Sequence, residues 1–380
     1  MKIAILTTSS RTNYGGILQC YVLQTVLQGM GHEVEVIKWS DSYVFSFCDV
    51  LRGIYKKLIN KIKGRNEYVW VQLRTYIIHR RIIRFIVKNI RFTNEKYYGG
   101  TDLECLSDSG FDVFIVGSDQ VWRKEYALLK IELYYLSFLK GENKKRIAYS
   151  ASFGVDYKEY TPELITKCGD LFSLFDAVSV REDSGLNLIE EYQWRCKKDC
   201  IQTLDPTMLL NKNDYKRLFH LNMERYTTNI FAYLLDIQSE ADCILERLAI
   251  EKKLKIVKVQ SIDTLITGYR SLFAAPSLSP TQWMEHIASS QFVITDSFHG
   301  CVYSILFHKS FIVVGNAMRG NTRISSLLRL VQLEDRLVSS LEDFEQRKKT
   351  LLSSIDYEKV ESILDEKRAL SLEFIKASIN

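Results

Sequence analysis

The chain has 380 residues and a mass of 44.2 kDa, which is enough for two or three domains or for one large α/β unit. Hydrophobic residues make up 46% of the sequence and charged residues 26%, with only 4 prolines, so a disordered, collagenous or proline-rich chain is excluded. The net charge of +5 is too small to indicate a nucleic-acid-binding protein, and no nucleic-acid partner is expected.

The first residues form a short apolar run that predicts a buried strand and is too short for the core of a signal peptide. No stretch approaches the ~18 consecutive apolar residues of a membrane-spanning helix. We therefore expect a cytoplasmic protein. The eight cysteines are scattered, and the closest pair, Cys196 and Cys200, is not a CxxC motif, so we expect free thiols and no metal site.

Short apolar runs alternate with segments of helical periodicity along most of the chain, which is typical of parallel sheets covered by helices. The expected strands are 3–7, 33–38, 113–116, 146–150, 177–180, 201–204, 230–234, 255–259, 292–295 and 311–314. The expected helices are 16–30, 162–175, 183–192, 240–251, 280–289, 301–307, 324–330 and 357–377. The strands fall into two sets on either side of residues 205–213, a polar stretch with a proline that indicates a joint between domains. We expect an N-terminal domain over 1–210, a C-terminal domain over 211–340 and a helical segment over 341–380.

A basic segment interrupts this alternation inside the first domain, at about residues 43–96. Within it, Arg52–Arg91 holds twelve lysines and arginines against one acid, Glu67, a net charge of +11 that leaves −6 for the rest of the chain. A basic amphipathic helix can lie on an anionic membrane surface, here the inner face of the cell membrane. The alternative is a helical insertion that covers the domain with its apolar side and exposes its basic side. The sequence leaves both open.

The loop after the first strand leads into Asn13, Tyr14 and Gly15 at the start of a helix. A helix N-terminus at the edge of an open sheet favours an anionic ligand. The alternative is a tight turn that lets the helix pack closely on the strand. The loop is not a GxGxxG motif and lacks the lysine of a P-loop, so neither a dinucleotide site nor a nucleoside triphosphate site is predicted.

Polar residues also follow the third expected strand, in the sequence GSDQVW. Ser118, Asp119 and Gln120 are able to hydrogen-bond sugar hydroxyls, and Trp122 is able to stack on a sugar ring. The alternative is a helix cap formed by Ser118 or Asp119, with the tryptophan in the core.

Three arginines are placed to bind anions. Arg181 ends the strand at 177–180, where its planar guanidinium is able to bind a phosphate or carboxylate through two hydrogen bonds. The alternative is an ion pair between Arg181 and Glu182. Arg319 and Arg323, four residues apart near a helix start, form a pair of cations that is able to hold a polyanion. The alternative is that both are solvated cations, although positive charge at a helix N-terminus is mildly unfavourable.

His299 lies between a strand and an apolar helix, in the sequence TDSFHG. Histidine takes up and releases a proton near neutral pH because its ordinary pKa is ~6.5. We expect Asp296 or Ser297 to orient the ring. The alternative is a histidine that only hydrogen-bonds within the turn. A nucleophilic triad is not predicted, because GxSxG is absent and no cysteine lies in a catalytic context.

At these motifs the sequence resembles the polysaccharide pyruvyl transferase family, from about residue 1 to 335 with a gap over the basic segment. The motifs NYGGILQCYVLQ, VGSDQVW, SVRE, LDPTMLL, ITDSFHG and NTRISSLLRLVQLEDRL occur in the order of the family's blocks. The resemblance implies an α/β fold with two Rossmann-like domains and an interdomain cleft, like that of the GT-B glycosyltransferases.

The resemblance also implies a reaction. The donor would be phosphoenolpyruvate, a co-substrate, with no other cofactor, and the acceptor a sugar or lipid-linked oligosaccharide of a cell-surface polysaccharide precursor. The product would be a cyclic pyruvate ketal, with phosphate released. His299 and Arg181 match the catalytic and donor-binding positions, and Ser297, Arg319 and Arg323 would also bind the donor. The acceptor would bind Asn13, Tyr14, Gly15, Ser118, Asp119, Gln120 and Trp122. The alternative is a nucleotide-sugar-dependent glycosyltransferase of the same fold.

Overall fold

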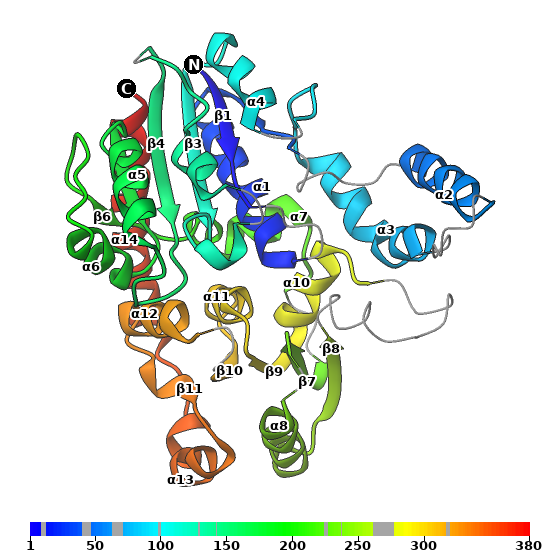
Figure 1. Ribbon diagram of the computed structural model, residues 1–380. Helices are drawn as coiled ribbons and strands as arrows, with labels where there is room; N and C mark the ends of the chain where they lie inside the picture. The colour runs from blue at the N-terminus through cyan, green and yellow to red at the C-terminus, as the bar shows by residue number, and fades with distance from the viewer. Residues whose placement is uncertain are drawn as a thin grey trace.

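The computed structural model describes residues 1–8, 13–39, 47–62, 71–97, 100–127, 130–141, 143–223, 227–236, 238–260, 277–316 and 320–380. In these residues the chain forms two parallel β-sheets, each flanked by helices, and Figure 1 shows one sheet above the other. The predicted fold class of two parallel α/β domains is confirmed.

The first sheet has the described strand order β2-β1-β3-β4-β5-β6, and every neighbouring pair is parallel. Its strands are β1 (Lys2–Leu6), β2 (Glu33–Val36), β3 (Val113–Asp119), β4 (Lys145–Ala151), β5 (Ala177–Val180) and β6 (Ile201–Gln202). β3 and β4 lie at the centre and are buried on both faces, which explains their continuous apolar sequences.

The second sheet has the described order β11-β10-β9-β7-β8 and is also parallel throughout. Its strands are β7 (Thr227–Leu234), β8 (Lys255–Gln260), β9 (Ser290–Thr295), β10 (Ser310–Val314) and β11 (Leu337–Val338). The first sheet therefore ends at Gln202 and the second begins at Thr227.

Helices connect the strands and cover the sheets, as parallel strands require. They are α1 (Tyr14–Gly29), α2 (Phe47–Ile62), α3 (Val71–Asn89), α4 (Gly100–Leu103), α5 (Pro162–Phe172), α6 (Asp183–Glu191), α7 (Lys212–Phe219), α8 (Ser239–Lys252), α10 (Pro280–Ser289), α11 (Phe298–Leu306), α12 (Thr322–Leu330), α13 (Leu341–Leu351) and α14 (Tyr357–Ile379), with the 3₁₀ turn η5 (Pro206–Leu209).

Side chains from both halves pack into one apolar core where the two sheets meet. Tyr14 of α1 stacks on Trp283 of α10 with ring centroids 5.4 Å apart, and its hydroxyl donates a hydrogen bond to the carbonyl of Leu278. The hydroxyls of Tyr215 and Tyr303 are 3.0 Å apart. The joint is therefore closely packed along α1, α10 and α11.

The last helix, α14, returns from the second sheet to the first (Figure 1). The amide of Leu204 donates to the hydroxyl of Ser371 over 3.0 Å, and Nε of Arg368 donates to the carbonyl of Met208 over 3.0 Å. The segment predicted at 341–380 thus contains two helices in different places, because α13 packs beside α8 at the second sheet.

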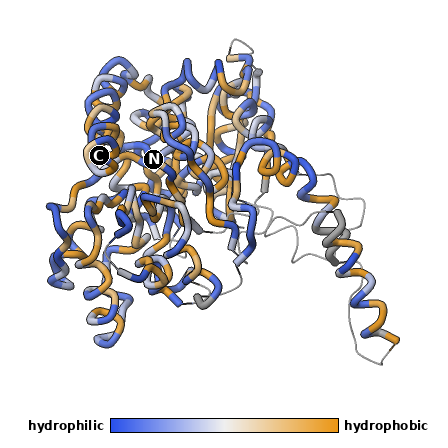
Figure 2. Tube along the Cα trace, turned by 90° about the horizontal axis from the view of Figure 1, so that it is seen from above, coloured by the Kyte–Doolittle hydropathy of each residue, from blue (hydrophilic) through white to orange (hydrophobic). Residues whose placement is uncertain are grey.

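The basic segment also contains two helices in different surroundings. α3 buries Ile78, Ile82 and Phe85 in the core beside α1. α2 contacts α3 and projects from the body of the molecule, as Figure 2 shows. The interpretation of this segment as a helical insertion that covers the domain therefore fits α3 but does not fit α2. Residues 63–70 lie outside the described residues. Among the described helices, none combines the length and the apolar character that crossing a bilayer requires.

Candidate functional site

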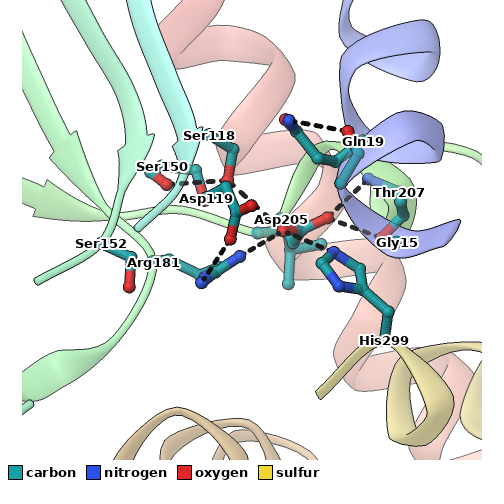
Figure 3. Close-up of polar contacts among 12 residues, drawn as sticks. Gly15, Gln19, Ser118, Asp119, Ser150, Ser152, Arg181, Asp205, Thr207 and His299 are labelled. Carbon is teal, nitrogen blue, oxygen red and sulfur yellow. Dashed lines mark hydrogen bonds and ion pairs between the residues drawn. The ribbon is translucent and has the colours of Figure 1, made fainter. Parts of the chain in front are cut away.

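Residues that follow strands of both sheets lie together at the joint (Figure 3). In parallel α/β sheets, ligands bind at the carboxyl ends of the strands. Here Asp119 ends β3, Arg181 follows β5, and His299 lies in the first turn of α11, directly after β9. Asp205, just before η5, lies between Arg181 and His299.

Arg181 is buried among three carboxylates. Its Nη1 donates a hydrogen bond of 3.0 Å to Oδ2 of Asp205, while Asp119 and Glu182 each lie 3.7 Å from other guanidinium nitrogens. Nε and Nη2 have no hydrogen-bond partner, although Cζ lies 4.4 Å from the ring centroid of Phe298. Burial alone would lower the pKa of Arg181, but the three carboxylates raise it above the ordinary value, so the side chain stays charged.

Asp205 receives polar contacts on both carboxylate oxygens. Oδ1 accepts hydrogen bonds from the hydroxyl and the amide of Thr207, over 2.6 and 3.0 Å. Oδ2 accepts from Arg181 and, over 3.3 Å, from Ser118. Burial alone would raise the pKa of Asp205, but the charges of His299 and Arg181 and the Thr207 hydrogen bond hold it well below its usual range. The carboxylate is therefore ionised at neutral pH.

His299 faces this carboxylate from the second sheet. Its Nε2 lies 3.6 Å from Oδ2 of Asp205 and has no hydrogen-bond partner, although the side chain is only 5% exposed. The ring packs against the edge of Phe298 and against the backbone of Gly15. A buried ring nitrogen beside an ionised carboxylate is suited to carry a proton during a reaction.

Arg323 is a second cation at the same place. It lies in the first turn of α12, and its buried Nε has no hydrogen-bond partner. Burial and the charge of Arg181 lower the pKa of Arg323 to about 10, so it remains protonated at neutral pH. Among the described residues no ion-pair partner of Arg323 is found, which leaves its guanidinium for an anionic ligand.

Glu182, the neighbour of Arg181, holds the loop that follows β4. Its Oε1 accepts hydrogen bonds from the hydroxyl of Ser152 over 2.7 Å and from the amide of Gly154 over 3.0 Å. Oε2 has no hydrogen-bond partner. The predicted pair of Arg181 and Glu182 therefore exists as one part of a larger network.

A polar pocket of about 590 Å³ opens beside this network, between α6 and α12. It is lined by carboxylate, amide and hydroxyl groups, among them those of Asp156, Asp183, Asn187, Thr322 and Ser325. These are the groups that hydrogen-bond sugar hydroxyls.

Several predicted acceptor contacts are corrected by their burial. Trp122 is 0% exposed and stacks on Tyr135 with ring centroids 5.2 Å apart, so it belongs to the core and offers no face to a sugar. Tyr14 is 1% exposed and holds the two halves together. The hydroxyl of Ser118 is buried and donates to the carbonyl of Ser150 over 2.9 Å as well as to Asp205, so it positions that carboxylate.

The prediction that Asp296 or Ser297 orients His299 is also wrong. Asp296 accepts hydrogen bonds from the amides of Leu235 and Asp236, away from the imidazole. Ser297 caps α11 by accepting a hydrogen bond from the amide of Gly300 over 3.3 Å. Asp205 takes the place predicted for Asp296.

The other predicted residues are placed as follows. Asp119 accepts a hydrogen bond of 2.9 Å from the hydroxyl of Thr8 and faces Arg181. Gln120 accepts from the side chain of Arg123 over 3.3 Å. Asn13 is exposed and caps α1 by accepting from the amide of Gly15 over 3.0 Å. Arg319 lies outside the described residues.

Asp205 is the main residue that the sequence analysis missed. It stands in the motif LDPTMLL, which was interpreted as a domain joint and as one block of the family resemblance, with no site residue assigned to it. A buried acid before a proline at such a joint was a usable signal, because polar residues at a joint often face the cleft between domains.

The fold is of the GT-B type, with two parallel α/β domains, and the residues of the candidate site come from both of them. UDP-N-acetylglucosamine 2-epimerase from Rickettsia bellii is similar in fold, with a TM-score of 0.58 and 9% identity over 100% of this chain and 97% of that chain. The UDP-GlcNAc 2-epimerase of Methanocaldococcus jannaschii gives a TM-score of 0.51 and 10% identity, covering 93% of each chain. At these identities the similarity shows the fold alone.

The sequence shows to which family with this fold the chain belongs. The model of the family described as polysaccharide pyruvyl transferase matches residues 13–317, which is most of the chain, and the protein belongs to this family. No curated protein sequence matches this chain. The predicted family, fold and kind of enzyme are therefore confirmed.

Proposed function

We propose that this enzyme transfers the pyruvyl group of phosphoenolpyruvate to two hydroxyls of a hexose in a cell-surface polysaccharide precursor. The product is a cyclic ketal, and phosphate is released. Membership of the family supports pyruvyl transfer in general. The convergence of His299 with the cations Arg181 and Arg323 is the observation that carries the choice of donor. We place the reaction in the cytoplasm, where this donor is made.

The donor is a small polyanion with a phosphate and a carboxylate. Arg323 and the Nε and Nη2 of Arg181, which make no hydrogen bond in the structure, supply the donors of charge-assisted hydrogen bonds. Arg181 and Arg323 lie near three carboxylates, those of Asp119, Glu182 and Asp205.

The chemistry requires balanced proton movements. Two C–O bonds form at C2 of the donor, and the bond from C2 to the phosphate oxygen breaks. C3 gains one proton as the methylene becomes a methyl group, and each acceptor hydroxyl loses one, the second proton leaving with phosphate. His299 is the general acid and base of this exchange, and the carboxylate of Asp205 faces its Nε2. Such groups typically contribute ~10²–10⁴ in rate.

The acceptor sugar is assigned to the polar pocket between α6 and α12. The pocket borders the network through Asp183, the neighbour of Glu182, and through Thr322, the neighbour of Arg323. This assignment replaces the buried Trp122 as a sugar contact. The predicted acceptor residues Asp119, Gln120 and Asn13 are not among the residues that line the pocket.

A nucleotide-sugar glycosyltransferase is the second candidate. What favours it is the fold, because the similar solved structures are UDP-sugar epimerases. The two candidates differ in their donor, and this difference decides the experiment.

Calorimetric titration of the purified protein with phosphoenolpyruvate, UDP and UDP-N-acetylglucosamine distinguishes the pyruvyl transferase from the nucleotide-sugar glycosyltransferase. We expect phosphoenolpyruvate to bind and the nucleotides not to bind. Phosphate release in the presence of hexose acceptors then measures turnover, which His299→Ala lowers ~10²–10⁴-fold in a folded protein. Binding of the nucleotides alone would overturn the proposed donor, and normal turnover by His299→Ala would remove the role of this histidine.

A further inference from the structure

The helix α2 exposes an apolar ridge that nothing in the described structure covers. Leu51, Tyr55, Leu58 and Ile62 are 50%, 68%, 45% and 85% exposed. Their spacing of four, three and four residues places them on one face of the helix. Other exposed large apolar residues are scattered singly, as is normal on a protein surface. A continuous ridge of this kind on a projecting helix indicates a binding surface.

Basic residues flank this ridge. Arg52 and Lys56 each follow a ridge residue and lie about 100° further round the helix, and both are exposed. α2 carries four cations against one acid, Asp49, and α3 carries five cations and no acid. Arg80 and Arg84 of α3 are exposed as well. The ridge therefore lies within a strongly positive region.

The charge decides between the surfaces that could cover the ridge. A second copy of this chain would bring two positive helices together, and the repulsion would oppose pairing. An anionic bilayer offers both an apolar interior for the ridge and negative headgroups for the flanking cations. We propose that α2 docks this enzyme on an anionic membrane surface, with the ridge inserted at the level of the headgroups.

The way in which α3 is attached to the rest of the molecule supports membrane docking through α2. Phe85 of α3 contacts the ring of Tyr21 at 5.9 Å between centroids, and the carbonyl of Ile78 accepts hydrogen bonds from the amide and hydroxyl of Ser277. α3 is thus fixed to both halves of the molecule, and it holds α2 away from the core (Figure 2). Docking through α2 leaves the site at Asp205 unchanged, so the inference does not depend on the proposed chemistry.

Co-sedimentation of the full chain with vesicles tests the proposal. We expect binding to vesicles of phosphatidylcholine mixed with phosphatidylglycerol, and little binding to phosphatidylcholine alone or at high salt. The double variant Tyr55→Ser/Ile62→Ser and the double variant Arg52→Gln/Lys56→Gln should each lower the bound fraction at least tenfold. Ile250→Ser, which removes a 77% exposed apolar residue from α8, is the matched control and should bind like the wild type.

Two results would overturn the proposal. One is equal sedimentation of the wild type and both double variants with anionic vesicles. The other is a lipid-independent dimer, seen by analytical ultracentrifugation, that Tyr55→Ser/Ile62→Ser dissociates, because the ridge would then join two copies. Titration of the same variants with phosphoenolpyruvate should give the affinity of the wild type. A loss of vesicle binding then concerns docking alone and says nothing against the proposed reaction.

Discussion

The ring of His299 occupies the space that a side chain at Gly15 would need. A Cβ at this glycine would lie 2.0 Å from both Cγ and Nδ1 of the imidazole. Gly15 belongs to the first turn of α1 and His299 to the first turn of α11, so the contact crosses the joint between the two sheets. The glycine therefore sets how closely His299 approaches Asp205.

Replacing Gly15 by alanine should displace the imidazole and lower turnover. A displacement of about 1 Å at a reacting group costs up to ~10²-fold in rate, so we expect a loss of ~10–10²-fold in phosphate release. Gly29→Ala, in the same helix but with no atom within 4 Å of the added carbon, is the control and should keep full activity. Equal turnover of the two variants would show that His299 tolerates the shift.

Arg323→Gln should weaken donor binding while leaving the fold intact. The guanidinium has no ion-pair partner among the described residues, so its removal leaves no described carboxylate newly unpaired. One charge-assisted hydrogen bond is worth ~1.5–3 kcal/mol, which corresponds to a ~10–10²-fold higher dissociation constant for phosphoenolpyruvate. Arg329→Gln, an exposed arginine of the same helix, should bind the donor normally. Unchanged affinity of Arg323→Gln in calorimetry would place the donor elsewhere.

Arg181→Ala should destabilise the protein as well as weaken donor binding. It leaves the carboxylates of Asp119, Glu182 and Asp205 without their shared cation, and breaking a buried pair in this way costs ~3–5 kcal/mol. Arg181→Lys should recover only part of the lost stability, because lysine lacks the planar guanidinium that binds two carboxylate oxygens at once. Denaturant unfolding measures the effect, and an unchanged free energy of unfolding for Arg181→Ala would show that the network is not structural.

The sequence predicted most of the alternating strands and helices, because apolar runs of parallel strands are continuous. The strand at Ala177–Val180 and the helix at Pro280–Ser289 match to the residue. α7 and α13 were missed because each buries few side chains, Tyr215 in one and Phe344 and Leu351 in the other. Such helices depend on their caps and neighbours and show little periodicity.

The site was predicted only in part, because spatial convergence is not visible in a single sequence. His299 and Arg181 were identified from their positions after strands, and they do meet. Their common partner, Asp205, lies 24 residues from Arg181 in the chain and reaches it only through the fold. Conversely, Trp122 followed a strand as ligand-binding residues do, but the aromatic cluster around it buries it.

The buried carboxylate of Asp205 should make stability depend on pH in a defined range. Its pKa in the folded protein lies below the unfolded value of about 3.9, so the folded state favours the ionised form. The stability it contributes is therefore fully present above the unfolded pKa and is lost as the pH falls through the folded pKa.

Asp205→Asn removes this contribution while keeping the shape of the side chain. The free energy of unfolding of the variant should be lower than that of the wild type by a constant amount above about pH 5, and the difference should narrow steadily as the pH falls below about 4 towards the folded pKa. Denaturant titrations between these conditions measure the difference. Asp183→Asn is the control for removing a carboxylate at the surface, since this side chain is 40% exposed and pairs with the exposed Arg329. A gap between Asp205→Asn and the wild type that does not narrow in acid would mean that the Asp205 charge does not stabilise the joint, since loss of hydrogen-bond geometry alone is independent of pH.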